Sequence, residues 1–121
     1  MLQTNLINAE KTIKNVVDKI NAKTATISDY NKTIQFYFTD EGAAYRIKIV
    51  NGKVENVEKS PDKKEAAVTV SCKAEVLQNI LDNKIGATRA LITRKVIVEG
   101  PILAIRELRQ KVLGPEHNTT A

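Results

Sequence analysis

Hydrophobic and polar residues follow two different periods along this chain, and the change of period predicts where helices and strands lie. Over residues 4–23 apolar side chains recur every three or four positions, the pattern of an amphipathic helix with Thr4 as its N-cap. Charged residues such as Lys14 and Lys19 face away from the apolar side. That apolar side consists of Leu6, Ala9, Ile13, Val16, Val17 and Ile20.

Residues 21–31 are polar and predict a loop, and four segments with a period of two follow it. This period is typical of half-buried strands, and Ile34, Phe36 and Phe38 share one face of the first of them. The sequence Asn51-Gly52 predicts a type I′ hairpin, because both central residues of that turn need a positive φ. The four predicted strands cover residues 33–39, 44–49, 53–58 and 66–71.

Beyond residue 71 the pattern becomes helical again. Ser71 is the predicted N-cap of a helix that buries Val76, Leu77, Ile80 and Leu81. A second, short helix is predicted over residues 87–92. The uninterrupted β-branched run Val96-Ile97-Val98 predicts a strand that is covered on both faces.

Pro101 predicts the start of a last helix, and Gly114 followed by Pro115 predicts its end. Residues 116–121 are expected to form a disordered tail. The sequence therefore predicts one α+β domain over residues 1–115, with the element order αββββααβα. We expect about five strands in one mainly antiparallel sheet, with the helices packed on one face.

Composition fits this prediction, since 42% of the 121 residues are hydrophobic and 27% are charged, as in ordinary globular domains. The formal net charge of +5 permits a nucleic-acid partner, but the basic residues are spread over both halves. Stacking aromatics are also scarce, because Phe36, Phe38 and Tyr45 alternate inward and leave only Tyr37 of that hairpin on the other face. We therefore expect no nucleic-acid binding.

The sequence contains few residues of the types and spacings that form catalytic or metal sites. The single cysteine, Cys72, is interpreted as a small buried residue, and the single histidine, His117, falls in the predicted tail. Asp40 and Glu41 are placed at a hairpin end, where carboxylates usually face solvent. The five glycines stand apart from one another and form no phosphate-binding loop. We expect no enzyme activity, no metal and no cofactor.

Some charged and apolar residues leave more than one interpretation open. Arg89, Arg94 and Lys95 form either a solvated face or an anchor for an anionic head group, since arginine makes paired charge-assisted bonds with carboxylate and phosphate. A third interpretation, a nucleic-acid face, lacks the stacking aromatics that single-strand binders use. Leu103 lies off the apolar face of the last helix. It is either a single exposed leucine or a contact with a lipid, a membrane surface or a second copy of the chain.

The C-terminal half combines the strand 67–71, the short helix ending in Ala90-Leu91-Ile92, the strand 95–98 closed by Gly100, and the helix over residues 102–108. In this order and hydrophobic character it resembles the sterol-carrier-protein type 2 family. Arg94-Lys95 stands where the family usually has Gly-Lys, Gly86-Ala87 replaces its Asn-Pro type turn, and Leu91-Ile92 replaces its aromatic pair. These changes alter the wall of the expected tunnel.

The resemblance implies non-enzymatic binding or transfer of a sterol or fatty-acyl lipid, with transient membrane contact, as a monomer or homodimer. The alternative is a structural or interaction module of the same fold without a ligand. No secretory signal is recognisable, so we expect a cytoplasmic protein. Because strands and helices each present one apolar face, a cavity is predicted between them, with any head group near Arg89, Arg94 or Lys95. The predicted cavity walls are Phe36, Phe38, Ile47, Leu77, Leu81, Leu91, Ile92, Ile105 and Leu108.

Overall fold

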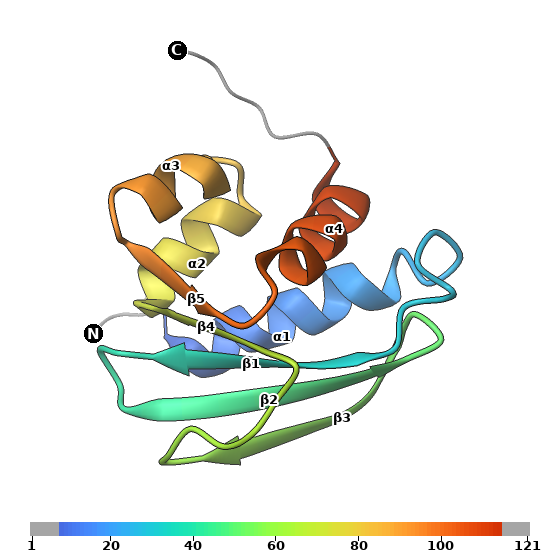
Figure 1. Ribbon diagram of the computed structural model, residues 1–121, viewed down its shortest axis with the longest axis horizontal. Coiled ribbons are helices and arrows are strands. Elements are labelled where there is room, and N and C mark those ends of the chain that lie inside the picture. Colours follow the sequence, from blue (N-terminus) through green and yellow to red (C-terminus); the bar gives the residue numbers. More distant parts are fainter. Residues whose placement is uncertain (1–7, 115–121) are drawn as a thin grey trace, which may run out of the picture.

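The computed structural model describes residues 8–114, and these form a single sheet with four helices (Figure 1). The element order is the predicted αββββααβα. The predicted tail, with His117, lies outside the described residues. The elements are α1 (Ala9–Asn21), β1 (Lys32–Phe38), β2 (Ala43–Val50), β3 (Lys53–Ser60), β4 (Val68–Cys72), α2 (Ala74–Leu81), α3 (Ala87–Ile92), β5 (Val96–Glu99) and α4 (Ile102–Leu113).

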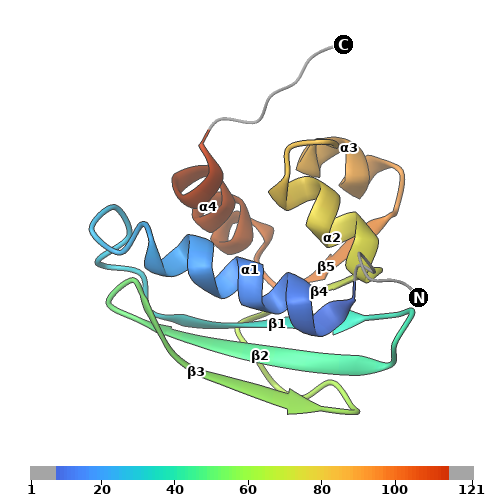
Figure 2. The same ribbon diagram turned by 180° about the vertical axis from the view of Figure 1, so that it is seen from behind.

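The five strands are ordered β3-β2-β1-β4-β5 in the sheet. β1 and β4 run parallel, and every other neighbouring pair is antiparallel. Figures 1 and 2 show all four helices on the same side of this sheet, from the front and from behind. The predicted fold class, an α+β domain with a mainly antiparallel sheet and helices on one face, is confirmed.

Strand register explains why one face of the sheet is apolar. Ile34 of β1 lies between Ile47 of β2 and Val68 of β4, and all three side chains are fully buried. Side chains alternate between faces along a strand, so this row and those two residues away point toward the helices. The neighbouring row, centred on Gln35, faces the opposite side and is polar.

The hairpin predicted at Asn51-Gly52 is confirmed by positive φ angles of 52° and 76° at these two residues. Its tip packs against the loop after α1, where the Gly52 N–H donates to the Tyr30 carbonyl at 3.0 Å. A Cβ at residue 52 would meet the Ile27 carbonyl oxygen at 2.4 Å. Glycine is therefore needed here for space as well as for its backbone conformation.

The helix starts differ from the predicted caps. α1 begins at Ala9, and Asn8 is its N-cap, since the Asn8 side chain accepts a hydrogen bond from the Lys11 N–H at 2.9 Å. The predicted cap Thr4 lies outside the described residues. The prediction that Ser71 caps α2 was wrong, because Ser71 belongs to β4 and α2 begins three residues later.

The carboxylates of the β1–β2 turn bond to both of these helix starts. Asp40 Oδ1 accepts a hydrogen bond from the Ala74 N–H at 3.2 Å, and Glu41 Oε2 accepts one from the Ala9 N–H at 2.8 Å. Unpaired N–H groups and the positive end of the helix dipole both favour an acidic partner at these positions. Asp40 and Glu41 were expected only to face solvent, but their carboxylates stabilise the starts of α2 and α1.

β5 was predicted to be covered on both faces, and this was wrong. It lies at the edge of the sheet, where only one face meets the helices. Val96 and Val98 face the helices, while the Ile97 side chain lies on the opposite face with 47% of its surface exposed. A continuous β-branched run therefore occurs here in a strand with one solvent-facing side.

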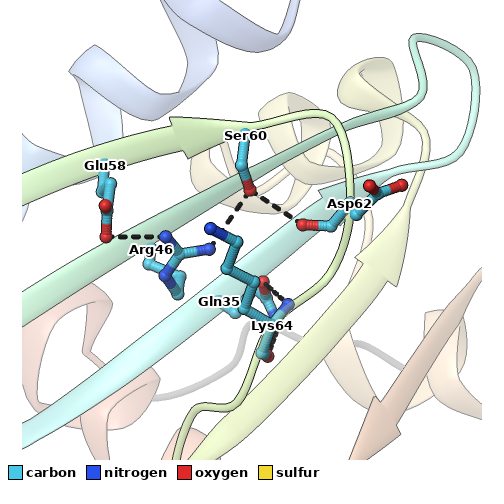
Figure 3. Close-up of polar contacts among 6 residues, drawn as sticks. All are labelled: Gln35, Arg46, Glu58, Ser60, Asp62 and Lys64. Carbon is cyan, nitrogen blue, oxygen red and sulfur yellow. Dashed lines mark hydrogen bonds and ion pairs between the residues drawn. The ribbon is translucent and has the colours of Figure 1, made fainter.

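The connection from β3 to β4 crosses the face of the sheet that has no helices. β3 lies at one edge and β4 lies beyond β1, so residues 61–67, the crossover loop, must pass over β2 and β1. Figure 3 shows the polar groups that bind this loop. Arg46, with 8% of its surface exposed, makes an ion pair with Glu58 at 2.6 Å and donates to Ser60 Oγ at 3.2 Å. The hydrogen bond from Arg46 lowers the pKa of Glu58 below its usual value.

Candidate functional site

An apolar pocket of about 110 Å³ lies between the helices and the sheet. Its lining draws on all four helices and on strands β1, β4 and β5. The apolar faces of amphipathic elements converge here, and the side chains leave part of the space between them unfilled. The lining residues are Val16, Lys19, Ile20, Phe36, Val70, Leu77, Ile80, Leu81, Ala87, Leu91, Val96, Val98, Ile105, Arg106, Leu108, Arg109, Val112 and Leu113.

Much of the predicted wall lies at this pocket. The predicted residues that line it are Phe36, Leu77, Leu81, Leu91, Ile105 and Leu108. The other three are elsewhere. Phe38 is fully buried and packs edge-on against the Tyr45 ring, with 5.7 Å between the ring centres. Ile47 is fully buried on β2, which packs against α1 away from β4 and β5. Ile92 lies at the end of α3 with 75% of its surface exposed.

The predicted basic residues are not part of the pocket lining. Arg89, Arg94 and Lys95 are exposed, and no described pocket includes them. α3 has only six residues, and it is followed by a turn in which Arg94 has a φ of 63°. This turn carries Arg94 and Lys95 toward solvent, while Arg89 is exposed on α3 itself. Leu103 is likewise exposed over 70% of its surface, so both sequence interpretations of that residue remain predictions.

Three other basic residues line the pocket instead. They are Lys19 of α1 with Arg106 and Arg109 of α4, and we call them the basic cluster. Lys19 was predicted to face away from the apolar side of its helix. Its long side chain can nevertheless lie along apolar surface while the ammonium group stays in water. No carboxylate occurs among the lining residues, so every formal charge at the pocket is positive.

Arg109 has an unusual environment within this cluster. Its Nη1 donates to the Gly114 carbonyl oxygen at 3.1 Å. Its Nε is buried and has no hydrogen-bond partner among the described residues. An unpaired buried donor is uncommon in folded proteins, and the penalty is larger when the group is charged. Arg109 therefore has a buried, unpaired donor on a helix that lines the apolar pocket.

Two further titratable residues, Cys72 and Tyr30, are buried and lie outside the lining of the apolar pocket. Cys72 is buried, and burial is the main cause that raises its pKa to about 12, which keeps the thiol protonated. Burial likewise raises the pKa of Tyr30 to about 12, and the Tyr30 hydroxyl donates to the Ala104 carbonyl at 2.8 Å. In residues 8–114, no three His, Cys, Asp or Glu side chains are grouped to hold a metal ion.

A second, polar pocket lies between the crossover loop and the exposed face of the sheet. Its main charged group, Arg46, is already engaged by Glu58 and Ser60. The residues that line this pocket are Thr33, Arg46, Lys48, Asn56, Glu58, Glu65, Ala66 and Ala67. Arg46 pairs with Glu58 and Lys48 pairs with Glu55, so most of the charge at this pocket is neutralised within the protein and the apolar pocket is the stronger candidate site.

An apolar pocket beneath the helices of a single sheet is the kind of cavity that suits an apolar ligand. The chain belongs to the SCP-2 sterol transfer family, whose model matches residues 5–112. The resemblance noted in the sequence is thereby confirmed. A search of curated proteins found no match to this chain. Within residues 8–114, none of the helices has the length and apolar character needed to cross a membrane.

Solved structures with the same fold include carriers and part of a larger enzyme. The crystal structure of a sterol carrier protein 2 aligns with a TM-score of 0.65 at 12% identity, over 86% of this chain and 88% of the other. A palmitated SCP2L2 from Aedes aegypti aligns with a TM-score of 0.61 at 16% identity, over 88% of this chain and 98% of the other. The TM-scores establish a common fold.

A stereoselective inverting sec-alkylsulfatase from Pseudomonas sp. aligns with a TM-score of 0.70 at 18% identity. The alignment covers 80% of this chain but only 16% of the sulfatase. This chain therefore corresponds to about a sixth of that enzyme, so the same fold occurs both as a nearly whole chain and as one segment of a larger protein.

Proposed function

We propose that this protein binds a sterol or fatty-acyl lipid non-covalently in the apolar pocket and catalyses no reaction. The observation that carries the proposal is the pocket itself, which lies between sheet and helices in a member of a sterol transfer family. The palmitated state of the Aedes aegypti neighbour supports an acyl chain as one ligand. An apolar ligand also accounts for the absence of a polar motif, since burial of each methylene contributes about 0.8 kcal/mol.

The volume of the pocket sets a condition on this function. A cavity of roughly 150 Å³ holds a molecule the size of benzene, so the 110 Å³ described here accepts only a short piece of a lipid chain. A longer chain requires the helices to separate. α4 is suited to this movement, since it buries only Ala104, Leu108 and Val112 among its twelve residues. Helix shifts of this kind are a common response to ligands.

Native mass spectrometry of the purified protein tests the proposal directly. We expect a co-purified lipid, or binding of added hexadecanoic acid or cholesterol in one-to-one stoichiometry after delipidation. Failure of delipidated protein to bind either compound at micromolar concentrations would contradict lipid binding.

Two adjacent residues of β5 give a matched pair of variants. Val98 lines the pocket, whereas Ile97 lies on the opposite face of the same strand. Val98→Phe fills part of the pocket and should weaken lipid binding at least tenfold. Ile97→Phe adds a ring on the solvent side and should leave binding within twofold of wild type. Equal binding by both variants would place the lipid elsewhere.

The small pocket volume favours one alternative, a module of this fold that binds no ligand and acts through protein contacts, including those of a dimer. Such a module would show no lipid in native spectra. Filling its pocket with Val98→Phe would then raise its thermal stability without loss of any function. The lipid titration therefore separates the two hypotheses.

A further inference from the structure

β5 forms an open edge of the sheet. It pairs with β4 on one side, and among residues 8–114 no strand lies on its other side. Figure 1 shows the strand at the end of the sheet, following α3 and preceding α4. The outward N–H and C=O groups of an edge strand can pair with another strand, and proteins usually prevent this with charges, prolines or bulges. The run Val96-Ile97-Val98 contains no charge and no proline.

The opposite edge strand, β3, is protected in this way. Its register against β2 shifts between Lys48 and Ile49, which is the sign of a β-bulge. Half of the residues of β3 are also charged, namely Lys53, Glu55, Glu58 and Lys59. Of the two sheet edges, β5 is therefore the one that is suited to pairing with another strand.

The exposed apolar side chains of residues 8–114 gather around β5. Large apolar side chains are exposed at Val57 and at four positions within residues 92–103. Ile97 lies on the strand, Ile92 precedes it, and Ile102 and Leu103 follow it. A single exposed apolar residue is ordinary, but several in one region indicate an interaction surface.

The charges beside this strand are complementary to those of a second copy of the chain. Lys95 and Glu99 stand two residues on either side of Ile97, and all three side chains are exposed. When two copies of β5 pair antiparallel with Ile97 opposite Ile97, Lys95 of each copy lies opposite Glu99 of the other. Opposite charges in facing positions stabilise an antiparallel pair. Glu99 also pairs with Lys63 at 3.4 Å, but a carboxylate can accept from more than one cation.

We propose that the protein forms a two-fold symmetric homodimer in which two copies of β5 pair antiparallel about Ile97. A two-fold contact requires a surface that is complementary to itself, and the order Lys95, Ile97, Glu99 meets this requirement. The same register brings Ile92 of one copy toward Ile102 of the other. The exposed apolar residues on both sides of β5 are thus included in the contact.

The dimer would place the two apolar pockets next to each other. Facing residues of an antiparallel pair point to the same side of the sheet, so the helices of both copies lie on one side. Val96 of each copy then faces Val98 of the other, and both residues line the apolar pocket. The proposal goes beyond lipid binding and does not depend on it.

Sedimentation equilibrium of the full chain without added lipid tests whether the dimer exists. β5 has only four residues, and each copy carries a net charge of +5 that opposes association. Because small interfaces are weak, we expect a dissociation constant on the order of 100 μM. A monomeric mass at about 1 mM protein would overturn the proposal and leave lipid binding intact. This measurement needs no variant.

Exchange of the two charges tests the register. Lys95→Glu and Glu99→Lys each place like charges opposite one another twice in the dimer, so each should weaken it about tenfold. The double variant Lys95→Glu/Glu99→Lys keeps the net charge and restores both ion pairs, so its dimer should return to within about threefold of wild type. Lys53→Glu makes the same charge change on β3 and should not weaken the dimer. A double variant as weak as the single variants, or a dimer lost in Lys53→Glu, would overturn this interface.

A cysteine at the two-fold axis gives an independent test. Facing Cα atoms of an antiparallel pair lie about 4.5–5.5 Å apart, within the range that a disulfide spans. Ile97→Cys should therefore form a disulfide-linked dimer under mild oxidation. Val57→Cys is the matched control, because Val57 is an exposed apolar residue on the other edge strand. Wild type controls for the buried Cys72. Equal rates of cross-linking for Ile97→Cys and Val57→Cys would contradict pairing through β5.

Discussion

Gln35 and Lys64 are joined by two hydrogen bonds of opposite direction. Gln35 Nε2 donates to the Lys64 carbonyl oxygen at 2.7 Å, and the Lys64 N–H donates to Gln35 Oε1 at 2.8 Å (Figure 3). Gln35 is fully buried, and its Nε2 also donates to Thr69 Oγ1 at 3.0 Å. One side chain thus holds the crossover loop on the sheet and links β1 to β4.

We expect Gln35→Ala to lower the free energy of unfolding by about 1–3 kcal/mol, because it leaves the polar groups of Lys64 and Thr69 without these partners. Chemical denaturation at neutral pH measures the change. Gln35→Glu is the matched control, since it keeps the acceptor for the Lys64 N–H but loses the donor. A cost of less than about 0.5 kcal/mol for Gln35→Ala would show that water replaces these bonds without penalty.

This pair also shows what the sequence could and could not predict about the fold. The alternation of Ile34, Phe36 and Phe38 predicts which face of β1 is buried, and the structure agrees. It says nothing about the opposite face, where Gln35 is buried by a loop thirty residues later in the chain. The same limit applies to Asp40 and Glu41, whose partners at the starts of α1 and α2 are distant in sequence.

The apolar part of the candidate site could be predicted from the sequence, because it is formed by the apolar faces of amphipathic helices. Leu77, Leu91 and Leu108 line the pocket because their helices direct an apolar side toward the sheet. The basic cluster was not predictable, since Lys19 and Arg109 lie on helices that meet only through the tertiary fold. Ile92 was predicted to line the pocket but is exposed, because α3 has only six residues and ends before a full apolar face can form.

Gly42 and Gly52 both have a positive φ, of 62° and 76°, but we expect substitution by alanine to lower the free energy of unfolding by different amounts at the two positions. Gly52→Ala is destabilising because alanine disfavours a left-handed backbone and because its Cβ would lie 2.4 Å from the Ile27 carbonyl oxygen. Gly42→Ala, with φ +62°, is destabilising through the backbone conformation alone, because nothing lies within 4 Å of its Cβ. We expect about 1 kcal/mol for Gly42→Ala and at least about 2 kcal/mol more for Gly52→Ala.

Urea unfolding of both variants checks this difference. Equal costs would mean that the Asn51-Gly52 hairpin tip moves away from residues 24–27 without penalty. In that case the hydrogen bond from the Gly52 N–H to Tyr30 would contribute little to the position of the loop.

Alkaline pH should destabilise the protein through Cys72 and Tyr30. Burial raises the pKa of Cys72 from 9.0 to about 12, and it raises the pKa of Tyr30 from 10.0 to about 12. Above pH 9 the unfolded chain loses the Cys72 proton while the folded chain keeps it. The unfolded state then binds fewer protons, so the free energy of unfolding falls as pH rises. The contribution is complete below pH 9 and is lost as pH approaches 12.

The Cys72→Ala variant isolates the part of this effect that comes from the thiol. At pH 7 the variant should be less stable than wild type, because it leaves a small cavity beside β4. Between pH 9 and 11 the stability gap should narrow by up to about 1.4 kcal/mol per pH unit, since only wild type carries the thiol. Lysine and tyrosine titrations affect both proteins and cancel in the difference. Urea unfolding under reducing conditions measures the gap, and a gap that stays constant from pH 7 to 11 would show that the Cys72 thiol ionises as readily in the folded as in the unfolded chain.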